Sequence, residues 1–440
     1  MKRDLTQGSI FRNIMHAAAP MMIALAVQTG FNVVDSIYVG RISPEAIGAV
    51  ALAFPIMFFM FALAGGIGIG ANSVISRLLG AKKTEEAENV AEHALLLGAV
   101  ISAVLSVLGL LGSKKLLVLM GAGTLLDLSM EYITVMFTGA IFLIMFTIAN
   151  NIFRAHGNFK TPMIAMLIST CSNIILDPIF IFALGLGVRG AAVATVLSNV
   201  IGAIIVFTIL YRRKYIDICF RYFRYNLVLV KSIFKVGIPT SLNQISMSLG
   251  MFALIKIVST FGPLAITAFG IGFRLDSIAV LPAMGLMMGV IPVVGQNYGA
   301  KMYDRVKKTA NRAAIISALF TGIVGLIFLI IPKPFIMLFN NDPTILRYAL
   351  AYLRIVPLTY VFMGFGMTMS GAFLGTGHAM PALAITVLRV IVLAPILAYF
   401  MAITLGWGLV GVWWALMAST LTAGIISMIW FNLGTWKKPS

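Results

Sequence analysis

The sequence predicts an all-α integral membrane protein with 12 transmembrane helices in two similar six-helix bundles. Three observations support this fold class: an apolar composition, apolar runs long enough to cross a bilayer, and a second half that repeats the first. Hydrophobic residues make up 60% of the 440 residues and charged residues only 10%, with a mean hydropathy of +1.02. A water-soluble protein of this composition would expose large apolar surfaces, so the expected solvent is lipid.

Polar breaks divide the chain into apolar runs of roughly twenty residues or more, the length that an α-helix needs to cross a bilayer. A helix also satisfies its backbone hydrogen bonds internally, as lipid requires. The predicted spans are 14–37, 46–70, 91–113, 130–153, 163–184, 190–211, 233–256, 265–291, 312–332, 347–372, 382–404 and 408–433. The first is longer than the apolar part of a cleaved signal peptide, so we expect it to be retained.

Lysine and arginine set the expected orientation. Most of the 32 basic residues fall at the two termini and in the loops that twelve spans place on the same side. By the positive-inside rule that side is cytoplasmic, which predicts a multi-pass protein of the cytoplasmic membrane with both termini inside. A net charge of +18 could also suit nucleic acid. Because these charges lie in short loops beside apolar runs, we expect no nucleic-acid partner.

The second half of the chain repeats the first at a shift of 219 residues. Pro20 falls on Pro239, AIGAVALAFPI from Ala46 falls on AITAFGIGFRL from Ala265, and HGNFKTP later matches TGHAMP with one residue deleted. Six spans per half give both halves the same orientation. The repeat therefore predicts a pseudo-twofold axis along the membrane normal, and alternating access by rocking of the two bundles about a shared cavity.

These observations predict three parts: an N-lobe at 1–211, a cytoplasmic linker at 212–235 and a C-lobe at 236–440. The linker, RRKYIDICFRYFRYNLVLVKSIFK, is expected to be either a short helix at the membrane interface or a solvated loop. The two cysteines, Cys171 and Cys219, support no disulfide framework.

Two acids fall deep within predicted spans of the N-lobe, where an unpaired charge costs roughly 2.5 to 3.5 kcal/mol on insertion scales. Asp35 shares a helix face with Gln28, two turns earlier, and Asp177 shares one with Asn173, one turn earlier. Pro178 has no N–H and would leave a backbone carbonyl available beside Asp177. Carboxylate and carbonyl oxygens are suitable cation ligands, so these residues predict a cation site.

Asn150 in the fourth span and Thr195 in the sixth add amide and hydroxyl oxygens to this set. Such a group suits Na⁺, and a carboxylate in an apolar bundle is equally suited to carry a proton, so the sequence leaves the ion open. The alternative is that these side chains only hydrogen-bond helices together, which is common for Gln28, Asn150 and Thr195. Pro20 predicts a kink in the helix that carries Asp35, unless that helix begins near Pro20.

Other charges within spans are Arg274, Asp276 and Arg389, for which we favour structural pairing across helices of the second half. The sequence holds no nucleotide-binding or zinc-protease motif and no credible catalytic triad, so we expect neither an enzyme nor a cofactor. The glycines of GGIGIG at Gly65 to Gly70 lie inside a span, where we expect them to allow close helix packing.

Five segments carry a family resemblance: PMMIALAVQTGFNVVDSIYVG, GANSVISRLLGAKKTEEAENV, NNIFRAHGN, SNIILDPIFIF and GAAVATVLSN. With the twelve spans and the 6+6 repeat, they resemble the multidrug and toxic compound extrusion (MATE) family over essentially the whole chain. By position, Gln28, Asp35, Asn150, Asn173, Asp177 and Thr195 match the N-lobe cation site of its DinF-like and archaeal members, and Pro20 matches their first-helix bend. The seventh and tenth spans lack the acids of NorM-type members, so a C-lobe cation site of that type is not expected.

The resemblance implies a secondary-active multidrug antiporter that exports organic cations or amphipathic drugs in exchange for Na⁺ or H⁺. If the ion is Na⁺, Asp35, Asn173, Asp177 and Thr195 are its expected ligands. The rival function is a flippase for lipid-linked oligosaccharides or other anionic lipids, and a third is a membrane scaffold or receptor. An acidic site favours the antiporter, and the chain is expected to work as a monomer in contact with membrane lipid.

Overall fold

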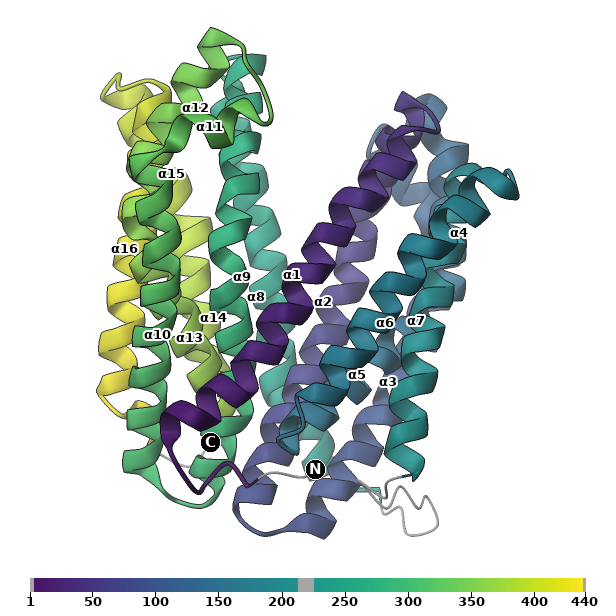
Figure 1. Cartoon of the computed structure of the whole chain (residues 1–440), viewed down its shortest axis with the longest axis vertical. Coiled ribbons are helices and arrows are strands. Elements are labelled where there is room, and N and C mark those ends of the chain that lie inside the picture. The colour runs from purple at the N-terminus through teal and green to yellow at the C-terminus, as the bar shows by residue number, and fades with distance from the viewer. Residues whose placement is uncertain (1–3, 213–224, 438–440) are drawn as a thin grey trace. The chain divides into compact units, whose positions relative to one another are not determined.

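The structure is a computed structural model and describes residues 4–212 and 225–437. These ranges contain helices and no strand, in the order that Figure 1 shows. Eleven helices are long and apolar enough to cross a membrane, and a bent pair brings the number to 12. The predicted all-α fold with twelve spans is therefore confirmed.

The first half contains six spans. They are α1 (Ile10–Gly40), α2 (Pro44–Gly80), α3 (Thr84–Leu119), the pair α4 (Leu126–Thr138) and α5 (Ala140–Ala155) preceded by the short turn η1 (Gly123–Leu125), α6 (Lys160–Pro178) continued by η2 (Ile179–Ala183), and α7 (Gly187–Arg212). Helix starts are encoded locally. Ser43 accepts a hydrogen bond from the backbone N–H of Ala46 at 3.1 Å, and Pro44 occupies the first helical position, where no N–H is needed.

The second half also contains six spans. The first three are the single helices α8 (Leu227–Ser259), α9 (Pro263–Gly299) and α10 (Tyr303–Ile330). After the short α11 (Pro332–Met337), the next span consists of α12 (Pro343–Ile355), η4 (Val356–Thr359) and α13 (Tyr360–Thr376). The fifth consists of α14 (Ala379–Val387), η5 (Leu388–Leu393), α15 (Ala394–Tyr399) and η6 (Phe400–Thr404), and the sixth is α16 (Leu409–Asn432), which η7 (Thr435–Lys437) follows. Asp342 caps α12 by accepting from the N–H groups of Thr344 and Ile345.

Several spans differ from the regular helices that periodicity predicts. The fourth bends by 51° at Gly139, and the tenth passes through a 3₁₀ turn that contains Pro357. The fifth changes to π-helix directly after Pro178, because proline cannot donate the next helical hydrogen bond. α1 begins at Ile10, which corrects the alternative that this helix starts near Pro20.

The expected linker at 212–235 falls partly on structured residues. α8 begins at Leu227, so residues 227–235 are helical, whereas 213–224 lie outside the residues that the structure describes. Cys219 is among the latter, and Cys171 is a free, exposed cysteine.

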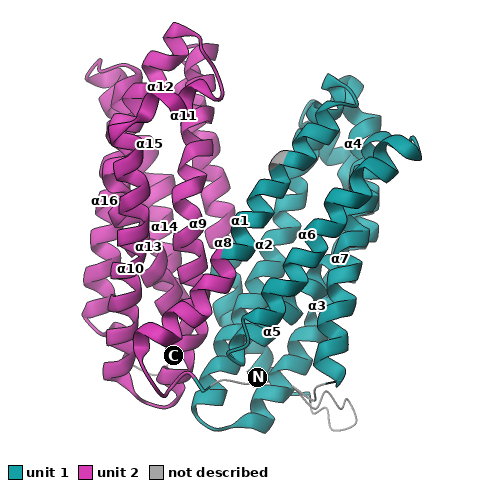
Figure 2. Cartoon of the chain, viewed as in Figure 1, with its two compact units in different colours: residues 1–4, 23–241 teal, residues 5–22, 242–440 magenta. Residues whose placement is uncertain are grey.

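The chain forms two compact units, each of which contains a half-helix from the other half of the sequence. Unit 1 comprises Met1–Asp4 and Ile23–Ser241, and unit 2 comprises Leu5–Met22 and Leu242–Ser440. The first part of α1 therefore belongs to unit 2, and the first part of α8 belongs to unit 1, as the two colours of these helices show in Figure 2. One boundary falls after Met22 and the other after Ser241. They lie 219 residues apart, which is the shift of the sequence repeat.

Glycines let the α8 half-helix approach α2 closely in unit 1. A Cβ atom on Gly70 would contact the carbonyl oxygen of Ile233, and one on Gly66 would lie 2.6 Å from the carbonyl oxygen of Gly237. Ser241 adds a hydrogen bond from its hydroxyl to the carbonyl of Ala62 at 2.9 Å. The prediction that the GGIGIG segment serves close helix packing is thus confirmed.

The matching glycines of α9 do the same for the α1 half-helix in unit 2. A Cβ on Gly285 would lie 3.0 Å from the backbone nitrogen of Met22, and one on Gly289 would lie 2.9 Å from that of Ala18. Gly285 and Gly289 are the repeat partners of Gly66 and Gly70. Each unit therefore packs the half-helix from the other half of the sequence against one pair of glycines. The two glycines of a pair are four residues apart and lie on one face of α2 or α9.

This packing predicts opposite effects for two alanine substitutions on α9. In Gly289→Ala the new methyl group meets the α1 backbone, and overpacking should lower the free energy of unfolding by about 1 to 3 kcal/mol. In the control Gly270→Ala, no atom lies within 4 Å of the new methyl group. Because alanine has a higher helix propensity than glycine, this variant should gain about 0.5 to 1 kcal/mol in free energy of unfolding. Thermal unfolding of the detergent-solubilised variants measures both, and equal shifts would contradict the close contact.

Candidate cation site

Asp177 lies fully buried on α6 in unit 1. One carboxylate oxygen, Oδ1, accepts a hydrogen bond from the side-chain amide of Asn173 at 2.9 Å. The other oxygen, Oδ2, is buried and has no hydrogen-bond partner. The one-turn spacing seen in the sequence therefore does place Asn173 against Asp177, and it leaves half of the carboxylate available to a ligand.

Asp35 lies on the part of α1 that belongs to unit 1 and is half-buried. Its Oδ1 is also buried and without a hydrogen-bond partner. The carboxylates of Asp35 and Asp177 interact electrostatically with each other. Two like charges in a medium of low dielectric repel strongly, so this pair favours any state in which a positive charge is added.

Tyr132 on α4 belongs to the same group, and the sequence prediction missed it. Its phenol interacts electrostatically with both Asp35 and Asp177. A tyrosine within an apolar span is ordinarily a packing residue, so composition gives no signal for such a role. The repeat does give a signal for Tyr132. In this part of the chain the two halves align at a shift of 220 residues, which places Gly157 on Gly377 and Tyr132 on Tyr352, and Tyr352 also meets an acid.

The other predicted site residues are arranged less closely. Thr195 on α7 donates its hydroxyl to the carbonyl of Ala191 at 3.0 Å, so its lone pairs, and not its proton, remain for a ligand. Asn150 on α5 is fully buried with a partnerless Oδ1, and Gln28 is exposed on α1. The structure describes no contact between the carboxylates and either Asn150 or Gln28.

Several acceptor oxygens in unit 1 are left without donors, which is a pattern that a cation site would require. Buried, partnerless oxygens occur on Asp35, Asn150 and Asp177, and an unsatisfied buried acceptor costs about 1 to 3 kcal/mol. Hard oxygen ligands of this kind fit Na⁺, and a proton on either carboxylate would also relieve the repulsion. Within 4–212 and 225–437, no cluster of three or more His, Cys, Asp or Glu side chains could hold a metal ion, so a transition-metal centre is not indicated there.

The charged residues predicted within spans of the second half do not pair with one another. Asp276 on α9 accepts hydrogen bonds from the hydroxyls of Tyr352, at 2.5 Å, and Tyr360. Arg274 is exposed and lies over the ring of Phe339, with the guanidinium carbon 6.0 Å from the ring centroid. Pairing across helices is confirmed for Asp276, although its partners are tyrosines.

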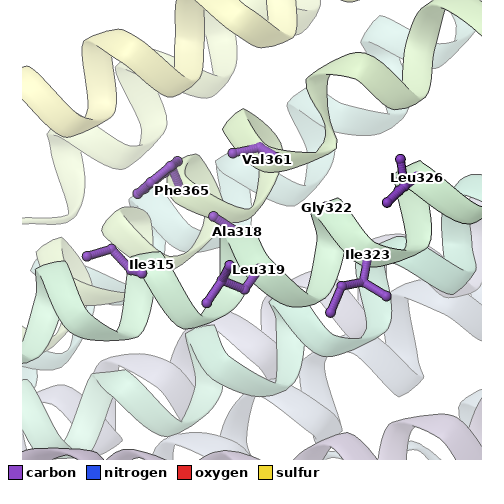
Figure 3. Close-up of a pocket in the computed structure, with 8 residues that line it drawn as sticks. All are labelled: Ile315, Ala318, Leu319, Gly322, Ile323, Leu326, Val361 and Phe365. Carbon is purple, nitrogen blue, oxygen red and sulfur yellow. The ribbon is translucent and has the colours of Figure 1, made fainter.

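A groove in unit 2 offers no such chemistry. It has a volume of about 370 Å³ and lies between α10 and α13, and its eight lining residues, drawn in Figure 3, are all apolar or glycine. Leu319, Ile323 and Leu326 line its α10 side and are exposed. This groove has no group to bind an ion, and its apolar side chains are of the kind that a helix surface presents to lipid.

Comparison with known proteins identifies the family. The family model MatE matches residues 20–179 and 239–400, one match in each half of the chain. The chain belongs to the MatE family. The match confirms the resemblance inferred from the sequence, and its two segments coincide with the two halves of the repeat.

Relatives of this MatE protein match it over nearly its full length. The multidrug export protein MepA of Staphylococcus aureus (strain MRSA252) is 31% identical over 438 residues, which cover 96% of this chain and 94% of that protein. MepA of Staphylococcus haemolyticus is 30% identical over 435 residues, covering 97% and 94%. A solved transporter of the MOP superfamily from Pyrococcus furiosus is 32% identical, with a TM-score of 0.95 and coverage of 99% and 98%.

Occupation of the site by its ion should stabilise the folded protein. Binding at about 100 times the dissociation constant contributes about 2.7 kcal/mol, so thermal stability in detergent should rise with Na⁺ or with H⁺ concentration. Asp177→Asn should abolish that rise, whereas Asp127→Asn, which alters an exposed acid of the same unit, should keep it. An Asp177→Asn protein that responds like the wild type would refute the site.

Proposed function

We propose that this protein is a secondary-active multidrug efflux antiporter that exports organic cations or amphipathic drugs in exchange for Na⁺ or H⁺. The observation that carries the proposal is that Asp35 and Asp177, two like charges that act on one another in the same unit, each keep a buried oxygen that no donor satisfies. An apolar span retains such a pair at a cost, and reversible cation binding is the function that requires it. The relatives named multidrug export proteins support the substrate class.

The ion would be held by the carboxylates of Asp35 and Asp177, with Asn173 fixing the orientation of the second. For Na⁺, Thr195 would supply a hydroxyl lone pair as a further ligand. For H⁺, either carboxylate would take the proton. Asn150, whose buried Oδ1 has no hydrogen-bond partner, and Gln28 would contribute amide oxygens to the same cation-binding set.

The link from ion binding to conformational change would run through α1. Asp35 lies on the part of α1 in unit 1, whereas Pro20 lies on the part in unit 2, three residues before the division at Ile23. Proline has no N–H for the helical ladder, so α1 is weakest beside that division. We propose that α1 bends at Pro20 when the ion binds, and that the bend changes how the two lobes open in the alternating-access cycle.

The remaining expectations belong to the same proposal. The N-lobe at 1–211 and the C-lobe at 236–440 would be related by a pseudo-twofold axis along the membrane normal, joined by the linker at 212–235. The basic loops support a position in the cytoplasmic membrane with both termini inside. The chain would transport as a monomer, with no cofactor. A flippase of anionic lipids is not favoured, because acceptor oxygens repel an anionic headgroup.

Transport by proteoliposomes tests this function under one imposed gradient at a time, either Na⁺ or pH. In a one-for-one exchange, a tenfold ion gradient supplies about 1.4 kcal/mol, equivalent to about a tenfold drug gradient. The double variant Asp35→Asn, Asp177→Asn should lose this ion-driven accumulation of ethidium, while Asp127→Asn should retain it. Undiminished ion-driven transport by the double variant would overturn the proposal.

A further inference from the structure

Asp276 is the acid of unit 2 that the proposed ion exchange does not use. It lies on α9, and it accepts one hydrogen bond from Tyr352 on α12 and another from Tyr360 on α13. Both tyrosines are 1% exposed, so the two contacts lie inside the unit. The ring of Trp413 on α16 packs edge-on against Tyr352, with centroids 4.8 Å apart. Asp276 itself is half-buried, and its carboxylate on α9 is held by α12 and α13.

The hydrogen-bond pattern here is the opposite of that around Asp35 and Asp177. Each oxygen of Asp276 already accepts from a tyrosine hydroxyl, and neither is among the buried atoms that lack a partner. The N-lobe group keeps buried oxygens with no hydrogen-bond partner, whereas both oxygens of Asp276 already have a donor. What Asp276 lacks is a compensating positive charge, and the smallest ligand that can supply one is a proton.

We propose that Asp276, held by Tyr352 and Tyr360, is a second ion-binding site of this protein, and that it takes a proton. The site lies in the eighth span, outside the seventh and tenth spans whose lack of acids argued against a C-lobe cation site of the NorM type. Proton binding at Asp276 does not depend on the proposed antiport. Only its use during transport rests on that function.

Among the described residues, the charged side chains of the helices around α9 are exposed or lie away from this carboxylate. α13 and α16 carry no charged residue, and the charges of α10 lie between Asp304 and Arg312, whereas Phe328 meets Tyr360. Arg347 and Arg354 of α12 and Lys256 of α8 are exposed, and α1 meets α9 at Gly285 and Gly289, more than two turns beyond Asp276. On α9 itself Arg274 is exposed and lies over Phe339. Protonation of Asp276 would therefore remove a negative charge that no described cation contacts.

The two tyrosines lie on opposite sides of the break in the tenth span. Tyr352 precedes the 3₁₀ turn η4, and Tyr360 begins α13 after it. An ionised carboxylate accepts from both hydroxyls, whereas a protonated one has a donor in place of one acceptor. Binding a proton would therefore release or reverse one of the two hydrogen bonds. The protonation state of Asp276 would in this way set the geometry of the break between α12 and α13.

The repeat supports this role independently. Tyr352 is the repeat partner of Tyr132, which interacts with the acids of the N-lobe site. Tyr132 precedes the 51° bend at Gly139, as Tyr352 precedes the 3₁₀ turn at Pro357. Both halves therefore have a tyrosine at the same position, just before a broken span, whose phenol is acted on by an acid, and in the second half the two are hydrogen-bonded.

Proton uptake by the purified full chain tests the proposal. In the Asp35→Asn, Asp177→Asn background, with the N-lobe site removed, a pH step in weak buffer should still produce proton uptake near neutral pH. Asp276→Asn should reduce that uptake by about one proton per chain, because the four histidines contribute equally to every variant. Asp276→Glu, which keeps a carboxylate, and Asp127→Asn, which alters an exposed acid, should show the full uptake. Unchanged uptake in the Asp276→Asn protein would overturn the proposal.

Trp413 provides a second measurement that does not depend on the folding of an Asp276 variant. Its contact with Tyr352 should make its fluorescence follow the protonation of Asp276, so the same background should show a pH-dependent component that Trp413→Phe removes. A pH-independent Trp413 signal would count against the site. Neither measurement uses transport, so failure of the proposed antiport would leave both readable, and failure at Asp276 would leave the N-lobe proposal intact.

Discussion

Lipid offers no hydrogen bond to a polar atom, and this constraint governs the structure at every level. It requires that each span be helical, and that any departure from the regular helix stay within a helical hydrogen-bond pattern. The breaks obey that rule. The chain passes into π-helix after Pro178 and twice in the eleventh span, and into a 3₁₀ turn at Pro357. In the parts of the spans that the structure describes, irregular geometry thus takes the form of tighter or wider helical turns and of the single-residue bend at Gly139.

The same constraint separates two kinds of intramembrane acid. Asp276 is satisfied within the protein, since each of its oxygens has a phenolic donor. Asp35 and Asp177 each keep a buried oxygen without a donor, although they also repel one another. Hydrogen bonds satisfy both oxygens of the first acid but leave its charge unbalanced, whereas the second pair keeps buried oxygens free for a positive ligand. The donors around an acid, and not its mere presence, separate the proposed cation site from the proposed proton site.

The features that the sequence predicts well are local or periodic. Span positions, the repeat, the packing role of Gly66 and Gly70, and the pairing of Asn173 with Asp177 all follow from short spacings along one helix. The missed features depend on contacts between distant residues. Tyr352 and Tyr360 lie 76 and 84 residues from Asp276, and Tyr132 is far in sequence from both of its acids. No periodicity encodes such contacts, because they arise only when separate helices pack.

The two halves keep a common frame but differ in their chemistry. The glycine pairs at 66 and 70 and at 285 and 289 hold equivalent half-helices, and Tyr132 and Tyr352 occupy equivalent places. The acids do not follow the repeat. Leu254 stands where the first half has Asp35, and Met57 stands where the second half has Asp276, and both are buried in apolar cores.

The span that matches α6 and η2 likewise contains no acid and carries Arg389. A single substitution at any of these positions would remove or add a membrane-embedded charge without disturbing the glycine contacts that define the fold. The frame and the charges could therefore diverge separately after duplication. This separation explains how two copies of one six-helix repeat can differ, with a pair of carboxylates in the first half and a single tyrosine-bound acid in the second.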